Sequence, residues 1–132
     1  MRSEEFGKRN QDMKSFRNLN VYINAKELVR RVYELLKKFP KEEQYALCDQ
    51  LRRAVVSIPS NIAEGCGRET QKDQTHFLNI AYGSLMEVLA QMDVACDLGY
   101  VQQEEFDEIE RFVDEEAKMI RGMIRKRKDA AL

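Results

Sequence analysis

The residues that could support catalysis or hold a metal are few in this chain of 132 residues. There is one histidine, His76, whereas a di-iron bundle uses carboxylates and a Glu-x-x-His motif on each of two helices. The acid three residues before it is Asp73, which is one methylene shorter than glutamate and stands alone. A Ser-His-Asp or Cys-His system would also need His76, and the spacing places no nucleophile beside it. We therefore expect no catalytic residue, no metal site and no enzymatic activity.

Cofactor-binding and export motifs are not indicated either. The glycines form neither a GxGxxG nor a GxxxxGK[ST] pattern, so no cofactor is expected. The cysteines, Cys48, Cys66 and Cys96, form no CxxC pair, and their odd number leaves at least one thiol unpaired within the chain. The first 14 residues lack the apolar segment of a signal peptide, and no continuous apolar stretch predicts a membrane span. We expect a cytoplasmic protein that does not enter a membrane.

Positive charge is concentrated near the end of the chain. Residues 117–132 contain six bases and one acid, whereas residues 102–116 contain eight acids and one base. Four of the bases repeat at intervals of three, four and three, which places them on one stripe of a helix: Lys118, Arg121, Arg125 and Lys128. Acids at the start and bases at the end also complement the dipole of a helix, which is the simpler interpretation. The alternative hypothesis is that the stripe binds nucleic acid, together with three further arginines, Arg52, Arg53 and Arg68.

A second candidate surface is small and polar. Four of its residues lie within about 60° of one another at 100° per residue, opposite the apolar positions of their helix: Arg53, Ser57, Ser60 and Glu64. Asn61 lies alongside. A solvated helix face is the simpler interpretation. Serine and asparagine are poor helix formers, however, which favours contact with another chain or with the carbonyl that Pro59 leaves without its usual partner.

Two apolar stripes fall outside the expected core positions. Ile80, Val94 and Leu98 lie together on the side of their helix opposite the core, and the next helix carries a similar flank at Phe112, Met119 and Met123. Single exposed apolar residues are ordinary in monomers. Two aligned sets on adjacent helices instead favour a contact between subunits. We therefore expect the chain to form a homo-oligomer.

The elements that position these surfaces are helices. With 43% hydrophobic and 34% charged residues, and with only 2 prolines and 6 glycines, the composition is that of one helical domain. Apolar residues spaced three and four apart predict helices over about 18–39, 41–64, 70–98 and 103–128. Short connections make neighbouring helices antiparallel. The sequence predicts an all-α, up-down-up-down antiparallel four-helix bundle over residues 18–128, with a flexible N-terminal arm (1–17) and a C-terminal tail (129–132).

The expected core positions follow the same spacing in each helix. They are Tyr22, Ala25, Val29, Val32, Leu36 and Phe39, flanked by Leu28 and Leu35; Cys48, Leu51, Val55, Ile58 and Ile62; Leu78, Ala81, Leu85, Val88, Met92 and Ala95; and Phe106, Ile109, Val113, Ala117, Ile120 and Ile124. The spacing continues without a slip through Pro59, so we predict one second helix that is kinked at Pro59. Gly99 is predicted to close the third helix in the left-handed conformation.

Several segments resemble the 23S rRNA-intervening-sequence family of four-helix bundle proteins. The similar segments are residues 39–47 (FPKEEQYAL), 50–65 (QLRRAVVSIPSNIAEG), 77–87 (FLNIAYGSLME) and 98–100 (LGY). The most specific part is residues 57–65 (SIPSNIAEG). The resemblance covers about residues 15–125. The family is named for reading frames found within insertions in bacterial 23S rRNA genes. Its relatives include the accessory variability proteins of diversity-generating retroelements, which are homopentameric and bind a reverse transcriptase and nucleic acid.

The resemblance implies a four-helix bundle, a homopentamer, and a partner that is RNA, DNA or a nucleic-acid enzyme such as a reverse transcriptase. This chain departs from the strongly basic retroelement branch, because its 22 bases are balanced by 23 acids. Two hypotheses therefore stay open. One is an adaptor for nucleic acid or a nucleic-acid enzyme that uses the basic residues above. The other is a protein–protein scaffold without nucleic-acid contact that uses Ser57, Ser60, Asn61 and Glu64.

Overall fold

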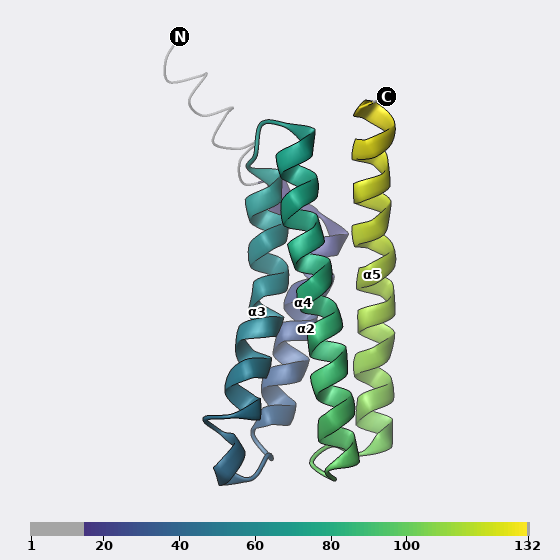
Figure 1. Cartoon of the computed structure of the whole chain (residues 1–132). Helices are drawn as coiled ribbons and strands as arrows, with labels where there is room; N and C mark the ends of the chain where they lie inside the picture. The colour runs from purple at the N-terminus through teal and green to yellow at the C-terminus, as the bar shows by residue number, and fades with distance from the viewer. Residues whose placement is uncertain (1–14, 132) are drawn as a thin grey trace.

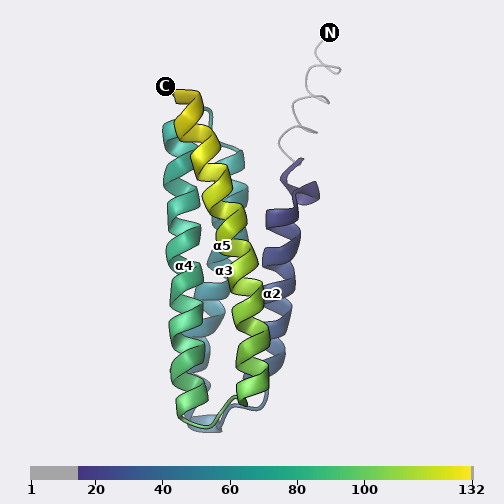
Figure 2. The same cartoon turned by 90° about the vertical axis from the view of Figure 1, so that its right-hand side faces the viewer.

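The computed structural model of the chain describes residues 15–131 and consists of four long helices (Figures 1 and 2). The helices are α2 (Asn20–Leu36), α3 (Leu47–Cys66), α4 (Gln71–Asp97) and α5 (Gln103–Ala131), with short 3-10 turns η1 (Ser15–Asn18) and η2 (Lys41–Glu43). The predicted all-α four-helix fold is confirmed. Residues 1–14 of the predicted arm lie outside the described residues, and α5 continues three residues past Lys128. None of the helices within residues 15–131 is both long and apolar enough to cross a membrane.

Consecutive helices run in opposite directions (Figure 2). Side-chain hydrogen bonds from α2 and the turn that follows it to α5 join residues in opposite chain order: Asn24 with Glu116, Arg31 with Glu108, and Lys38 with Glu105. The bonds between α3 and α4 follow the same rule: Gln50 with Gln91, and Ser57 with Ser84. Each helix packs against the next in the chain, and α2 also packs against α5, so the four helices close a bundle around one core.

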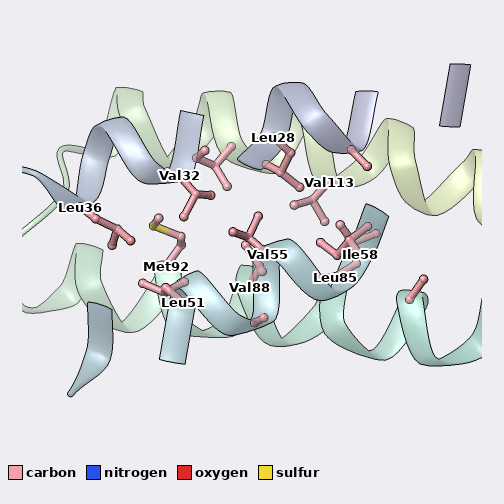
Figure 3. Packing of buried hydrophobic residues seen from close by; sticks show 14 of the residues in the cluster. Leu28, Val32, Leu36, Leu51, Val55, Ile58, Leu85, Val88, Met92 and Val113 are labelled. Carbon is pink, nitrogen blue, oxygen red and sulfur yellow. The ribbon is translucent and has the colours of Figure 1, made fainter. Parts of the chain in front are cut away.

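The core consists of apolar side chains from all four helices that point toward one another (Figure 3). Every core position predicted on α3 and α4 is buried. On α2 the prediction is correct at Ala25, Val32 and Leu36. It is wrong at two positions, because Tyr22 and Val29 are only half-buried and border α3, whereas Val21 and the predicted flanking residue Leu28 are buried. Both sets satisfy a spacing of three and four residues. The packing of α3 and α5 against the helix selects the set that includes Val21 and Leu28.

The connection between α2 and α3 also differs from the prediction. The second helix was expected to begin near residue 41, whereas residues 41–43 form the 3-10 turn η2 and α3 begins at Leu47. The side-chain amide of Gln44 donates to the carbonyls of Leu36 and Phe39, both at 3.3 Å, and so adds hydrogen bonds at the end of α2, where carbonyls lack their usual helical partners. The segment is thus used to cap α2 instead of extending α3.

Pro59 lies inside α3, which runs without a break from Leu47 to Cys66. The amide of Asn61 donates to the carbonyl of Ser57 at 2.8 Å, beside the proline, and not to the carbonyl of Val55 that the proline leaves without an N–H partner. A kink at Pro59 stays a prediction. At the end of α4, Gly99 has a φ of 82°, which confirms the predicted left-handed residue.

Two glycines are expected to respond to a larger side chain in opposite directions. A Cβ on Gly65, which is buried on α3, would lie 3.2 Å from the carbonyl oxygen of Gln74 and 3.3 Å from the Cβ of Phe77 on α4. Gly65→Val should therefore lower the free energy of unfolding by about 1–3 kcal/mol. A Cβ on Gly122 meets nothing within 4 Å, so Gly122→Ala should raise it by up to about 1 kcal/mol. Urea denaturation followed by circular dichroism measures both; equal effects would contradict the close packing of α3 on α4.

Candidate nucleic-acid interface

Three of the four bases in the predicted stripe line one groove. Arg121, Arg125 and Lys128 of α5 border a groove of about 400 Å³ together with Asn79 and Tyr82 of α4. The guanidinium of Arg121 lies over the ring of Tyr82, 4.8 Å from the ring centroid. An arginine held by an aromatic ring in this way keeps its N–H groups available for a phosphate or carboxylate. We call the surface formed by Asn79, Tyr82, Arg121, Arg125 and Lys128 the basic groove.

The fourth member of the stripe, Lys118, lies in different surroundings. It borders a separate shallow groove with Arg111, Phe112, Asp114 and Glu115 of the same helix. Two carboxylates thus flank Lys118, whereas the groove that contains Arg121 has no acid among its lining residues. The sequence pattern places all four bases on one stripe, but the structure divides them between a groove of mixed charge and a basic groove.

Of the other predicted bases, only Arg68 lies at the same end of the bundle as the basic groove. Arg68 follows α3, pairs with Glu64 at 2.6 Å and lies over the ring of Phe77, 4.7 Å from its centroid. Its charge is therefore partly neutralised. Its neighbour on the bundle end, Arg127, donates to the side chain of Gln74 at 2.9 Å and links α5 to α4.

Arg52 and Arg53 are not brought to this end. They lie near the start of α3, about 15 residues and thus roughly 22 Å from Arg68 along the chain. Arg52 donates to the backbone and side chain of Gln44, and Arg53 pairs with Asp49 at 3.4 Å. The structure thus separates these two arginines from the candidate interface and engages Arg52 in holding the α2–α3 connection.

The charges of the bundle are divided along its length. The hydrogen bonds of Asn24 to Glu116 and of Ser57 to Ser84 mark one level of the bundle. On the side of that level that contains the basic groove, residues 15–24, 57–84 and 117–131 hold nine Lys and Arg against four Asp and Glu. On the other side, residues 25–56 and 85–116 hold nine bases against 16 acids. The total charge is therefore balanced, but the two ends of the bundle carry opposite net charge. We call them the basic end and the acidic end of the bundle.

Part of the acidic charge of α5 is neutralised by α2. Arg31 pairs with Glu108 and Lys38 pairs with Glu105, both across the α2–α5 contact. The hydrogen bonds from Lys38 and from the backbone of Gln102 lower the pKa of Glu105. The basic residues after position 117 face no comparable row of acids, since residues 15–24 of the neighbouring segment contain none. Positive potential is thus left exposed at the basic end.

The predicted polar face on α3 is used largely within the chain. The hydroxyl of Ser57 lies 2.8 Å from that of Ser84 on α4, and Asn61 donates to the Ser57 hydroxyl at 2.9 Å. Ser60 is exposed and borders a groove between α3 and α2, while Glu64 pairs with Arg68. The small polar residues therefore include a hydrogen-bonded link between α3 and α4, which accounts for Ser57 and Asn61 without a partner chain.

The two predicted apolar stripes face different directions. Ile80, Val94 and Leu98 are 38%, 50% and 54% exposed on the outer face of α4. In contrast, Phe112, Met119 and Met123 are half-buried and pack against the core. Met119 and Met123 border a groove with Leu19 and Val21 at the start of α2. Of the two predicted stripes, the one on the outer face of α4 therefore exposes more apolar surface.

One residue that the sequence analysis missed is Glu116, which is completely buried. One of its carboxyl oxygens, Oε1, accepts a hydrogen bond from the amide of Asn24 at 3.0 Å, and the other has no partner. Burial raises the pKa of Glu116 to about 7, against the smaller opposing effect of the Asn24 hydrogen bond. A signal was available: Ile109, Val113, Glu116 and Ile120 follow the spacing of four, three and four, which places Glu116 on the core side.

Other titratable residues form no comparable site. Within residues 15–131, no three His, Cys, Asp or Glu side chains are grouped so that they could hold a metal ion. His76 is exposed, and its ring lies 5.2 Å from that of Phe77. Cys48 is buried, while Cys66 and Cys96 are half-buried; burial raises the pKa of each thiol. The chemistry that the described residues offer is thus concentrated in the basic groove and in Glu116.

Residues 17–122 match the family described as 23S rRNA-intervening sequence protein. Among solved structures, the chain is similar to a protein of unknown function from the S23 ribosomal protein family of Bacteroides thetaiotaomicron VPI-5482. That similarity has a TM-score of 0.73 at 23% sequence identity and covers 79% of this chain and 97% of the other, so it concerns the fold. No curated protein matches the chain.

Proposed function

The chain belongs to the 23S rRNA-intervening sequence protein family, and from this premise we propose that it is a non-enzymatic, self-associating bundle that binds nucleic acid through its basic end. The observation that carries the proposal is the basic groove, where Arg121, Arg125 and Lys128 converge without an acid among the lining residues. Contacts between Lys or Arg and phosphates supply most of the affinity of a protein for nucleic acid. A locally basic end can therefore bind RNA or DNA although the whole chain carries a net charge of −1.

Self-association strengthens this proposal because it gathers several basic ends. The outer face of α4 offers Ile80, Val94 and Leu98 to a second copy, along about 27 Å of helix. Copies arranged around a ring would bring their basic grooves together and raise the local positive potential. The family resemblance implies five copies, and we propose a closed homopentamer.

We propose binding to the nucleic-acid backbone without sequence readout. The basic groove offers arginine, lysine and one asparagine, together with a tyrosine whose ring is covered by Arg121. A covered ring is not free to stack on a base, and recognition of single strands by stacking needs free aromatic faces. The groove is therefore suited to phosphate groups, and both RNA and DNA should bind.

The triple variant Arg121→Gln, Arg125→Gln, Lys128→Gln tests this proposal. Fluorescence anisotropy with a labelled 20-nucleotide RNA at about 50 mM salt should show at least a tenfold loss of affinity, because about three phosphate contacts per subunit are removed. The bundle should stay folded, since Arg121, Arg125 and Lys128 are exposed.

A matched control removes three exposed bases from the acidic end: Lys37→Gln, Lys41→Gln, Arg53→Gln. It changes the net charge by the same amount, so its affinity should fall by less than about threefold. Equal losses in both variants would contradict a site at the basic end. Wild-type protein that does not bind RNA or DNA would contradict the proposal and favour the protein–protein scaffold.

A further inference from the structure

Glu116 is the one polar or charged side chain that is fully buried within the part of the chain that the structure describes. It lies on α5 between the core residues Val113 and Ile120. Its Oε1 atom accepts from Asn24, while its Oε2 atom has no hydrogen-bond partner. A carboxylate in such a place loses its hydration without full compensation, so the neutral form is favoured.

Asn24 connects Glu116 to α2. Its amide nitrogen donates to Glu116 at 3.0 Å and lies 3.3 Å from the backbone oxygen of Phe112, so one side chain of α2 bridges two groups of α5. Nearer the acidic end, exposed ion pairs of Arg31 on α2 and of Lys38 in the turn after α2 hold this part of the chain to α5. The first turns of α2 thus depend on the Asn24–Glu116 contact and on apolar packing.

The packing around α2 leaves open grooves on both sides. A groove of about 580 Å³ separates it from α3 beside Tyr22, Val29 and Pro59, and one of about 430 Å³ lies between its start and α5 beside Val21 and Met123. By comparison, α3 and α4 approach so closely that a Cβ on Gly65 would lie 3.2 Å from the carbonyl oxygen of Gln74. Water can therefore reach Glu116 with the least disruption if α2 moves away from α5.

The charged groups on α2 and α5 near this contact are directed elsewhere. On α2, Lys26 is exposed and Glu27 forms ion pairs along its own helix. On α5, Glu115 and Lys118 are exposed at the surface. The pKa of Glu116 is raised by burial, and the Asn24 hydrogen bond opposes this effect. None of these charged groups contributes to the shift.

The other two helices contribute apolar side chains at this level. Ile58 of α3 and Leu85 of α4 point into the core near Val113, one turn before Glu116 (Figure 3). The nearest titratable side chains of α4 to Leu85 along the helix are Glu87, which accepts a hydrogen bond from Gln91, and Tyr82, whose ring lies against Arg121. No counter-charge for an ionised Glu116 is therefore supplied by α3 or α4 among the described contacts.

We propose that Asn24 and Glu116 form a proton-controlled clamp between α2 and α5. With a proton on Glu116, the clamp is closed and residues Asn20 to Glu27 stay packed on α5. When Glu116 loses its proton, this part of α2 detaches so that the carboxylate gains water, while α3 and α4 stay packed on each other. Opening widens the groove beside Val21 and Met123, at the basic end of the bundle.

Hydrogen–deuterium exchange of the full chain at pH 6 and pH 8 tests the clamp. After correction for the intrinsic exchange rate, protection of residues 20–27 should fall about tenfold from pH 6 to pH 8. The reason is that the pKa of Glu116 is about 7 in the closed state and near its ordinary 4.5 in the open state, so the opening equilibrium shifts about tenfold toward the open state over this range. Residues 20–27 should be less protected than α3 and α4 at both pH values, because they exchange through a local opening and not only through global unfolding. In Glu116→Gln, protection of residues 20–27 should be the same at both pH values.

Glu115→Gln is the matched control, because Glu115 is the exposed neighbour of Glu116 on the same helix. It should reproduce the tenfold change of the wild type. Three results would overturn the clamp: unchanged protection of α2 in the wild type, a pH effect that persists in Glu116→Gln, or protection of residues 20–27 that equals that of α3 and α4 at both pH values. The last of these would indicate exchange through global unfolding in place of local opening.

Discussion

Replacing Glu116 with glutamine should stabilise the chain at pH 8 much more than at pH 4. The gain in the free energy of unfolding, variant minus wild type, should be larger at pH 8 by about 3 kcal/mol, since each unit of pKa shift corresponds to about 1.4 kcal/mol. The pKa of Glu116 is about 7 in the folded chain, against an ordinary value of 4.5. Because this pKa is raised, the contribution of protonated Glu116 to the free energy of unfolding is complete below pH 4.5 and is lost as the pH rises through 7. Glutamine keeps the size and the acceptor for Asn24 but does not ionise.

Urea denaturation at several pH values measures this effect as the difference between the variant and the wild type. Other carboxylates, such as Glu105 with its lowered pKa, titrate in both proteins and cancel in the difference. Glu115→Gln should show no pH-dependent difference from the wild type. A Glu116→Gln variant whose stability follows that of the wild type from pH 4 to pH 8 would mean that Glu116 is hydrated in solution.

The second large effect is expected for the outer face of α4. Multi-angle light scattering should give the wild-type protein a mass several times 15.5 kDa, with five copies as the proposed number. The double variant Val94→Glu, Leu98→Glu should have a mass near 15.5 kDa, because two carboxylates placed in an apolar contact lose hydration without a partner. Asp93 and Asp97, which precede them in the chain, add like-charge repulsion.

Ile23→Glu is the control for this experiment. Ile23 lies on α2 and is 50% exposed, as Val94 is, but it does not belong to the α4 face. Its mass should equal that of the wild type. A wild-type mass near 15.5 kDa that does not rise with protein concentration would contradict self-association, and a monomer produced by Ile23→Glu would place the contact on α2.

The fold was predictable because its signals are local and redundant. Cys48, Leu51, Val55, Ile58 and Ile62 keep one spacing through Pro59, and the structure places all five in the core of one uninterrupted helix. Gly99 was predictable for a similar reason, since few other residues adopt a positive φ at the end of a helix. Where several weak signals agree over one segment, the sequence is sufficient.

The register of α2 and the role of Glu116 depend on the neighbouring helices. Tyr22 and Val21 fit the apolar spacing equally well, and the choice between them is made by contacts with α3 and α5. Glu116 follows the core spacing, but its charge places it among the acids of residues 102–116, and buried carboxylates are rare. A strict count of three and four from Val113 would have included it.

The candidate interface was predictable only in part. The spacing of Lys118, Arg121 and Arg125 places them on one stripe of a helix, but it does not reveal the acids beside Lys118. Arg52 was grouped with the stripe by charge alone, and the direction of α3 carries it to the acidic end, where it bonds to Gln44. The distances between residues on different helices depend on how the helices are arranged, and a pattern of charges along the sequence does not predict that arrangement.

The salt dependence of RNA binding by the wild-type chain tests the proposed function most directly. Anisotropy titrations between 50 and 200 mM salt should give a linear plot of log affinity against log salt with a slope of about −2 or steeper, because each of about three phosphate contacts per subunit contributes roughly −0.7 on a single strand. Additional subunits on one strand make the slope steeper. Binding that is absent at about 50 mM salt, or that does not change with salt, would contradict recognition of phosphates by Arg121, Arg125 and Lys128.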